Sequence, residues 1–200
     1  SDRIIVLDLS GKNEPVLLTN LTVDQSAAGW RVSFVPANPD GSYLAVAESQ
    51  WVTVAGDALV APVDQDLKST GNRAAHLVIA PSSLADAART LADYRTSNGL
   101  ESQVVELPAI YDAFNWGIED PVAIRSFLEY AYNHWSVTPE YVVLAGKGSV
   151  DQKDRMGMGG NLVPVLLTQT PFGLAATDSR YGDVEGDDGV PEIAVGRIPA

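Results

Sequence analysis

An acidic, glycine-rich stretch near the C-terminus is the strongest chemical signal in the sequence. It carries the carboxylates of Asp183, Glu185, Asp187 and Asp188, with Glu192 beyond them. Asp183, Glu185 and Asp187 alternate, so a curved loop can point these three carboxylates at one centre, and the glycines among them permit tight turns. Hard oxygen ligands at this density suit Ca²⁺, although the spacing is not that of an EF-hand. The five residues are therefore candidate calcium ligands, and the alternative is a solvated acidic turn.

Nucleophiles and general bases are scarce in the chain. The sequence contains no cysteine, which excludes a disulfide, a thiolate metal site and a cysteine nucleophile within these 200 residues. Its two histidines are His76, at the start of a predicted strand, and His134, near the end of a predicted helix. We expect a structural role for the first, and a contact with helix carbonyls or solvent for the second. No G-x-S-x-G motif occurs, so a serine triad is not expected.

The strand that must position any site is Tyr141–Ala145, Y-V-V-L-A, which is continuously apolar and followed by the turn Gly146-Lys147-Gly148-Ser149. Such a run predicts a strand buried on both faces at the centre of a parallel sheet. Ligand sites in open α/β sheets form outside the carboxyl ends of such strands. The turn lacks the first glycine of a phosphate-binding loop, because position 141 is tyrosine, and this excludes nucleotide binding.

Residues 74–200 predict strands that alternate with helices. The helix before the central strand has an acidic N-cap, Asp120, and a proline at its first position. This β-α-β-α-β order predicts a parallel sheet with right-handed crossovers. The expected elements are a strand at His76–Ala80, a helix from Ser83 to Asn98, a strand at Gln103–Leu107, a helix from Asp120 to Trp135 and a last strand at Glu192–Val195.

Residues 1–73 have a different character. Short strands with regular turns, and no helical period, predict a β-rich, sandwich-like segment. Its last part, residues 61–73, is polar and charged and is interpreted as the linker. The sequence therefore predicts two domains, 1–73 and 74–200.

The charge and hydrophobicity of the chain limit which kinds of partner it can bind. The chain has 26 acidic against 13 basic residues, a net charge of −13, which disfavours nucleic acid. No apolar run approaches eighteen residues, so no membrane-spanning segment is expected. The N-terminus lacks the pattern of a signal peptide, and we expect the chain to be part of a longer protein. The sequence does not indicate an oligomeric state.

Segments in the second part of the chain resemble the gingipain-like cysteine peptidases of family C25, clan CD. Residues 1–73 resemble, more weakly, the β-rich region that often precedes the catalytic domain of such proteins. The matching segments are P-S-S-L-A-D-A-A-R-T-L-A-D-Y-R, N-G-L-E-S-Q-V-V-E-L-P-A-I-Y-D-A-F-N-W-G, D-P-V-A-I-R-S-F-L, P-E-Y-V-V-L-A-G-K-G-S-V-D and A-T-D-S-R-Y-G-D-V-E-G-D-D-G-V-P-E-I-A-V-G-R-I-P.

The resemblance implies a caspase-like, three-layer α/β/α fold and hydrolysis of polypeptides by a His–Cys dyad. In the family this dyad follows the G-R-I-P segment, so no catalytic residue is expected in these 200 residues. The resemblance also implies that Asp178 recognises a basic side chain of the substrate, as the aspartate of a similar segment does in arginine-specific gingipains. The alternative is that Asp178 caps or braces its loop. One departure is Gly146-Lys147, where relatives commonly have Gly-Asp.

These implications predict a fragment of a secreted, extracellular or cell-surface cysteine endopeptidase that is inactive by itself. It needs no organic cofactor, and Ca²⁺ is the one cofactor expected. The alternative is a non-catalytic, calcium-binding scaffold or surface module derived from the peptidase fold.

Overall fold

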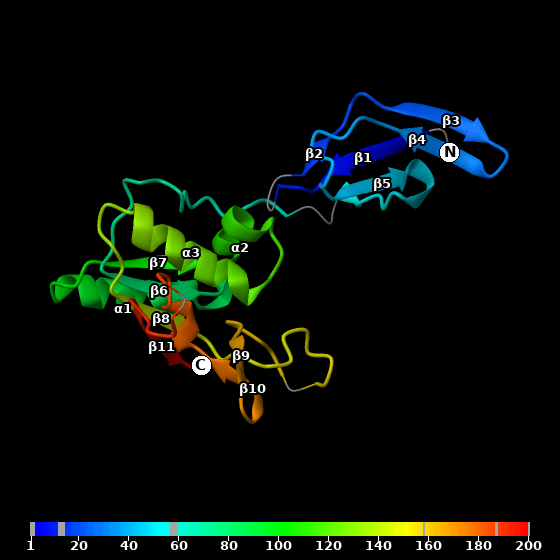
Figure 1. Ribbon diagram of the computed structural model, residues 1–200. Coiled ribbons are helices and arrows are strands. Elements are labelled where there is room, and N and C mark those ends of the chain that lie inside the picture. Colours follow the sequence, from blue (N-terminus) through cyan, green and yellow to red (C-terminus); the bar gives the residue numbers. More distant parts are fainter. Residues whose placement is uncertain (1–2, 12–14, 57–59, 158, 187, 200) are drawn as a thin grey trace. The chain divides into compact units, whose positions relative to one another are not determined.

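A computed structural model describes residues 3–11, 15–56, 60–157, 159–186 and 188–199. The chain divides into two compact units, Ser1–Val60 and Ala61–Ala200. All three α-helices of the described residues belong to the second unit (Figure 1).

The second unit is built on a four-stranded parallel sheet with the order β11-β8-β6-β7. The chain passes from β6 to β7 on one side and then returns to β8 and β11 on the other side. This confirms the predicted α/β class with a parallel sheet. The strands are β6 (His76–Ala80), β7 (Ser102–Glu106), β8 (Tyr141–Ala145) and β11 (Ala194–Ile198).

Helices cover both faces of this sheet, which gives three layers. Helix α1 (Ala85–Ser97) packs on β6 and β7, where Val78 and Ala80 meet Ala88 and Ala92. Helices α2 (Leu107–Asn115) and α3 (Pro121–His134) pack on the opposite face in the main core. The strand side chains alternate between these two clusters, because successive residues of a strand point to opposite faces. The expected three-layer arrangement is confirmed.

Strand β8 differs from its prediction. Val142 and Leu144 are buried toward α2 and α3, but Val143 and Ala145 are only half-buried on the other face, and Tyr141 is exposed. The strand buried on both faces is β6, all five of whose residues are buried. The reason is the position of α1, which contacts β6 and β7 and leaves the same face of β8 less covered.

The two long helices differ in how far their ends follow the local sequence. At α3 the prediction is confirmed, since the Asp120 carboxylate accepts a hydrogen bond of 2.7 Å from the backbone N–H of Val122. Val122 itself, in the first turn of α3, is 58% exposed. At α1 the sequence resembles a capping box, but the helix has no side-chain cap and Asp86 instead pairs with Arg89.

The segment 61–73 belongs to the second unit. Leu67 is 2% exposed and its carbonyl accepts a hydrogen bond of 3.0 Å from the indole N–H of Trp135. The hydroxyl of Tyr130 donates to the carbonyl of Lys68 at 2.7 Å. The contacts therefore separate the two units between Val60 and Ala61, rather than within the segment interpreted as a linker.

The first unit is antiparallel β structure, as expected. Among its described residues Val6 is the one buried hydrophobic side chain. One sheet has the order β2-β1-β5 and a second sheet pairs β3 with β4. The strands are β1 (Ile4–Asp8), β2 (Val16–Leu17), β3 (Thr22–Ser26), β4 (Gly29–Ser33) and β5 (Tyr43–Ala47).

Between β8 and β11 the chain forms a long loop and then an antiparallel hairpin of β9 (Leu166–Thr170) and β10 (Gly173–Thr177). Val163 and Val165 are buried just before the hairpin, outside any strand. In the described part of the chain, no helix has the length and apolar character that a membrane crossing requires.

Candidate functional site

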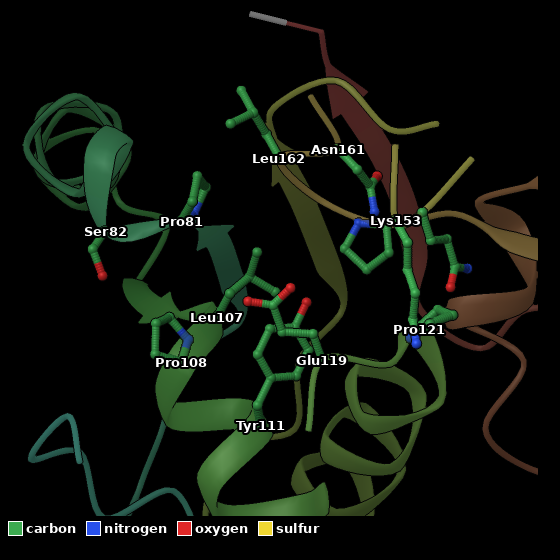
Figure 2. Close-up of a pocket in the computed structure, with 12 residues that line it drawn as sticks. Pro81, Ser82, Leu107, Pro108, Tyr111, Glu119, Pro121, Lys153, Asn161 and Leu162 are labelled. Atoms are coloured by element: carbon green, nitrogen blue, oxygen red, sulfur yellow. The ribbon is translucent and has the colours of Figure 1, made fainter. Parts of the chain in front are cut away.

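A pocket of about 250 Å³ lies at the carboxyl ends of β6, β7 and β8 (Figure 2). The order of the sheet reverses here, because β7 and β8 lie on opposite sides of β6. Such a reversal is where open α/β sheets place their ligands. The pocket thus lies where the parallel strands predict a ligand site, at the loops that follow their carboxyl ends. Its lining comprises Pro81, Ser82, Leu107, Pro108, Tyr111, Glu119, Pro121, Gln152, Lys153, Asn161, Leu162 and Pro164.

Two of the polar groups in the pocket come from the segment that joins α2 to α3 and from α2 itself. Tyr111 extends from α2 and Glu119 lies just before α3, and both side chains reach toward the centre of the hollow (Figure 2). Burial, followed by the charges of Glu119 and Asp120, raises the pKa of Tyr111 well above its ordinary value, so the phenol stays protonated. The pocket therefore offers a neutral hydroxyl beside a carboxylate.

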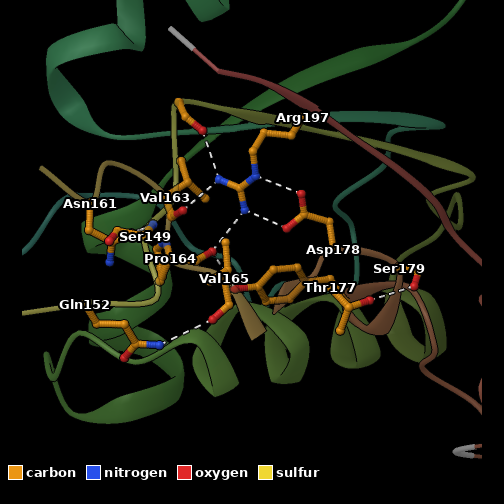
Figure 3. Close-up of polar contacts among 12 residues, drawn as sticks. Ser149, Gln152, Asn161, Val163, Pro164, Val165, Thr177, Asp178, Ser179 and Arg197 are labelled. Carbon is orange, nitrogen blue, oxygen red and sulfur yellow. Dashed lines mark hydrogen bonds and ion pairs between the residues drawn. The ribbon is translucent and has the colours of Figure 1, made fainter. Parts of the chain in front are cut away.

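Next to the pocket, Arg197 of β11 holds four parts of the chain together (Figure 3). Its guanidinium donates to both carboxylate oxygens of Asp178, with distances of 2.8 Å and 2.7 Å. It also donates to the carbonyls of Gly146, Val163 and Pro164, at 2.9 Å, 2.7 Å and 3.1 Å. The planar fork of arginine suits this two-pronged contact with a carboxylate. We call these residues the Arg197 clamp.

The clamp defines the surroundings of Asp178, the residue for which the resemblance implies substrate recognition. Its side chain is 28% exposed, and Arg197 occupies both carboxylate oxygens. Asp178 also precedes a short turn in which the fully buried Tyr181 donates its hydroxyl to the carbonyl of Pro164 at 2.8 Å. A substrate guanidinium at Asp178 would have to compete with Arg197, and the implied role stays a prediction.

The acidic loop, residues 182–192, uses several of its carboxylates to hold its own backbone. Glu192 accepts hydrogen bonds from the N–H groups of Val184 and Glu185, both at 3.0 Å. Asp188 accepts one from the N–H group of Val190 at 2.9 Å. The side chain of Glu185 is exposed.

Asp183 is the exception within the acidic loop. The residue is 1% exposed, and its Oδ2 accepts from Gly189 at 3.1 Å and lies 3.3 Å from the Arg180 guanidinium. Its Oδ1 has no hydrogen-bond partner among the described residues. Asp187 lies outside the described residues. Across the part of the chain that the structure describes, no three acidic or histidine side chains gather as metal ligands, and the calcium site stays a prediction.

Neither histidine lies in the pocket. His76 is buried, with its Nδ1 at 2.6 Å from the Ser102 hydroxyl oxygen. His134 places its Nδ1 at 3.0 Å from the carbonyl of Tyr130, one turn earlier in α3, as expected from the sequence. Both histidines thus have structural contacts.

Comparison with known proteins gives the family. The model of peptidase family C25 matches residues 69–200. The chain belongs to peptidase family C25. No curated protein sequence matches it.

Two solved structures from Porphyromonas gingivalis resemble this C25 chain. Dimeric latent PorU is 21% identical with a TM-score of 0.69, and the match covers 98% of this chain and 20% of PorU. The complex of the RgpB pro- and mature domains is 22% identical with a TM-score of 0.46, covering 64% of this chain and 25% of the other. The PorU match shows a shared fold, and this C25 chain spans about a fifth of the PorU length.

Three residues of the candidate site were not predicted from the sequence: Arg197, Tyr111 and Glu119. Arg197 carried a weak signal, since an arginine in the interior of an apolar strand needs an acidic or carbonyl partner. Tyr111 and Glu119 carried none, because a pocket is formed by segments that are distant in sequence.

Proposed function

We propose that this chain is part of a cysteine endopeptidase whose nucleophile lies outside these 200 residues. The observation that carries the proposal is the match to peptidase family C25 over residues 69–200. In this chemistry a thiolate attacks the peptide carbonyl and a histidine carries the proton. The sequence contains no cysteine, so the 200-residue chain by itself is expected to be inactive.

The segment's own contribution is the scaffold on which a substrate would lie. The carboxyl ends of the parallel strands present the pocket and, beside it, the Arg197 clamp, which ties the loop after β8 and Asp178 to the end of β11. We expect the substrate to be a polypeptide and the protein to be extracellular or on the cell surface, as the family membership suggests. The net charge of −13 disfavours nucleic acid as a partner.

The test is peptide cleavage by the full-length protein, with the 200-residue chain as the matched control. Peptides with basic, acidic and apolar residues before the scissile bond are assayed with and without a thiol alkylator. We expect alkylator-sensitive cleavage by the full-length protein alone. In the same assay, Asp178→Asn shows whether that carboxylate selects a basic residue: an unchanged preference removes that role.

The competing function is the calcium-binding scaffold without catalysis. It would follow if the folded, calcium-loaded and fully processed protein cleaved none of the peptides. For calcium itself, the unpartnered Oδ1 of the buried Asp183 is the one observation that favours an ion in the acidic loop. Titration calorimetry tests this calcium site: calcium should release or absorb heat on binding, and magnesium at the same concentration should not.

A further inference from the structure

One side of the parallel sheet is only half covered. Among the described residues, α1 is the one α-helix on this side, and it packs on β6 and β7, while α2 and α3 pack on the opposite side. The α1 side of β8 and β11 is therefore left largely open. The register of the two strands gives its residues, which we call the bare face: Tyr141, Val143 and Ala145 of β8 pair with Ala194, Gly196 and Ile198 of β11.

The bare face becomes more exposed toward the outer strand of the sheet. Val143 is half-buried, Tyr141 is 47% exposed, and Ile198 on the outer strand is exposed as well. A Cβ built on Gly196 would meet no atom within 4 Å, so open space lies above this residue. A groove of about 540 Å³ follows the face between β11 and the end of α1.

The composition of the bare face is that of a protein interior. Its six residues include no charged side chain, and the one polar group among them is the hydroxyl of Tyr141. Parallel sheets are covered on both sides, with helices as the covering layer, and this is why their strands are apolar on both faces. A contiguous apolar surface of this kind marks a place that another element covers. The element that the bare face lacks is a second helix beside α1.

The dimensions of the bare face fit a short helix. Tyr141 and Ala145 lie about 13 Å apart along β8, because a strand rises about 3.3 Å per residue. A helix spans this length in about two and a half turns. Small residues on the neighbouring strand, Ala194 and Gly196, allow another backbone to approach closely.

One cation stands at the rim of this groove. Arg95, near the end of α1, lines the groove together with His76 and Tyr141, the first residues of β6 and β8. Within the described part of the chain, no acidic side chain forms an ion pair with Arg95. For an exposed arginine this alone indicates no partner. It does decide the charge that a covering helix should carry, which is a carboxylate at the end of the groove where the strands begin.

We propose that a helix of about two to three turns, supplied by the part of the protein outside residues 1–200, covers the bare face and places a carboxylate beside Arg95. A second copy of the chain suits the face less well, because two chains with a net charge of −13 repel each other. The chain spans about a fifth of the PorU length, and a protein of that size has ample polypeptide for the helix.

This inference rests on the proposed function in one respect, namely that the protein extends beyond these residues. Its test measures the protection of side chains and not peptide cleavage, so either proposal can fail without the other.

Oxidation of tyrosine rings by hydroxyl radicals, mapped by mass spectrometry, tests the cover. The full-length protein is compared with the 200-residue chain, and Tyr94 on α1, which is 62% exposed and lies outside the groove lining, is the matched control. We expect Tyr141 to be oxidised about fivefold or more slowly in the full-length protein, because a covered ring no longer meets the solvent. Tyr94 should react at the same rate in both.

Three results would overturn the proposal. The first is an equal rate of oxidation of Tyr141 in the two proteins. The second is the same slowing at Tyr94, which indicates general shielding and not a cover on the bare face. The third is protection of Tyr141 in the 200-residue chain as its concentration rises, which assigns the face to a second copy.

Variants of the full-length protein separate the cover from its charge. Gly196→Leu fills the space that the helix should occupy, and Tyr141 should then be oxidised as fast as in the 200-residue chain. Arg95→Glu should weaken the protection of Tyr141 by repelling the carboxylate. The controls Ala87→Leu on α1 and Arg31→Glu on β4, both at exposed residues outside the groove, should retain it. Protection that survives Gly196→Leu contradicts the cover, and protection that survives Arg95→Glu contradicts the carboxylate.

Photo-cross-linking identifies the covering segment. Tyr141 of the full-length protein is replaced by a photoreactive phenylalanine, and the cross-linked peptides are mapped by mass spectrometry. We expect cross-links to one segment outside residues 1–200, at positions about three or four residues apart, as on one face of a helix. Cross-links confined to residues 1–200, or at alternate positions as in a strand, overturn the proposal.

Discussion

Removal of the Arg197 guanidinium is the sharpest test of how this end of the sheet is built. The variant is Arg197→Met, which keeps a long, flexible side chain and removes all five hydrogen bonds of the clamp. It leaves the Asp178 carboxylate without its cation and removes a donor from three backbone carbonyls, of which that of Pro164 keeps the Tyr181 hydroxyl. The loops after β8 and the segment before η4 (Ser179–Tyr181) then lose their shared anchor.

The magnitude follows from how buried the pair is. Loss of one partner of a buried ion pair costs about 3–5 kcal/mol, because the other charge stays in a poorly solvated place. Arg197 is 13% exposed and Asp178 is 28% exposed, so water compensates in part and we place the loss at the lower end, about 3 kcal/mol. Asp178→Asn keeps an oxygen for the guanidinium, and we expect a smaller loss of about 1–2 kcal/mol.

Urea unfolding followed by far-ultraviolet circular dichroism measures these losses, since the α-helices of the described residues lie in the second unit. The control is Arg89→Met, which breaks the two ion pairs that the 53%-exposed Arg89 makes with Asp86 and Glu106, and it should cost about 1 kcal/mol or less. The double variant of Arg197 and Asp178 should lose clearly less than the sum of the two single losses. A loss below about 1 kcal/mol for Arg197→Met, or additive losses, would refute the reasoning.

Four other predictions concern the fold and the acidic loop. Gly182→Ala places a Cβ 2.0 Å from a backbone carbonyl oxygen, so we expect the free energy of unfolding to fall by more than about 2 kcal/mol. The control Gly160→Ala adds a Cβ in open space and should change it by no more than about 0.5 kcal/mol. Urea unfolding measures both. Phe127→Ala removes a fully buried ring that packs between two aromatic neighbours, and the same measurement should show a loss of about 4 kcal/mol. Burial, followed by the charge of Arg95, lowers the pKa of His76 below 6.5 in the folded protein. The unfolded chain therefore takes up this proton at a higher pH, and the free energy of unfolding falls as the pH drops below 6.5. His76→Gln should flatten this pH dependence when urea unfolding is measured at several pH values. Calcium at a hundred times its dissociation constant should stabilise the acidic loop's unit by about 2.7 kcal/mol, and unchanged melting in chelator and in calcium would contradict the site.

The fold followed from the sequence where the signal is local. Periodicity, the Asp120-Pro121 helix start and the continuously apolar strands predict the α/β unit and its parallel sheet, and the structure confirms both. The errors concern contacts between distant segments. The sequence of β8 does not indicate that α1 covers β6 and β7 more fully than β8. In the segment 61–73, most residues are polar and predict a linker, although Leu67 is buried in the core.

The candidate site was predictable in its location but not in its chemistry. The rule for parallel strands gives the right edge of the sheet, because it depends only on topology. Asp178 could be named as a candidate from its sequence segment. Its partner Arg197 could not, because it lies nineteen residues later in the chain and in another element. Tyr111 and Glu119 have ordinary sequence surroundings, and only the fold brings them together with Lys153 in one pocket.

The central claim is that the chain belongs to a cysteine peptidase whose nucleophile lies outside residues 1–200. Covalent labelling tests this most directly. The full-length protein reacts with a peptide that carries a thiol-reactive electrophile, and mass spectrometry identifies the modified residue. We expect one modified cysteine, outside these 200 residues, and loss of peptide cleavage in proportion to the labelling. Specific labelling of a residue within 1–200, or cleavage that persists in the fully labelled protein, would contradict it.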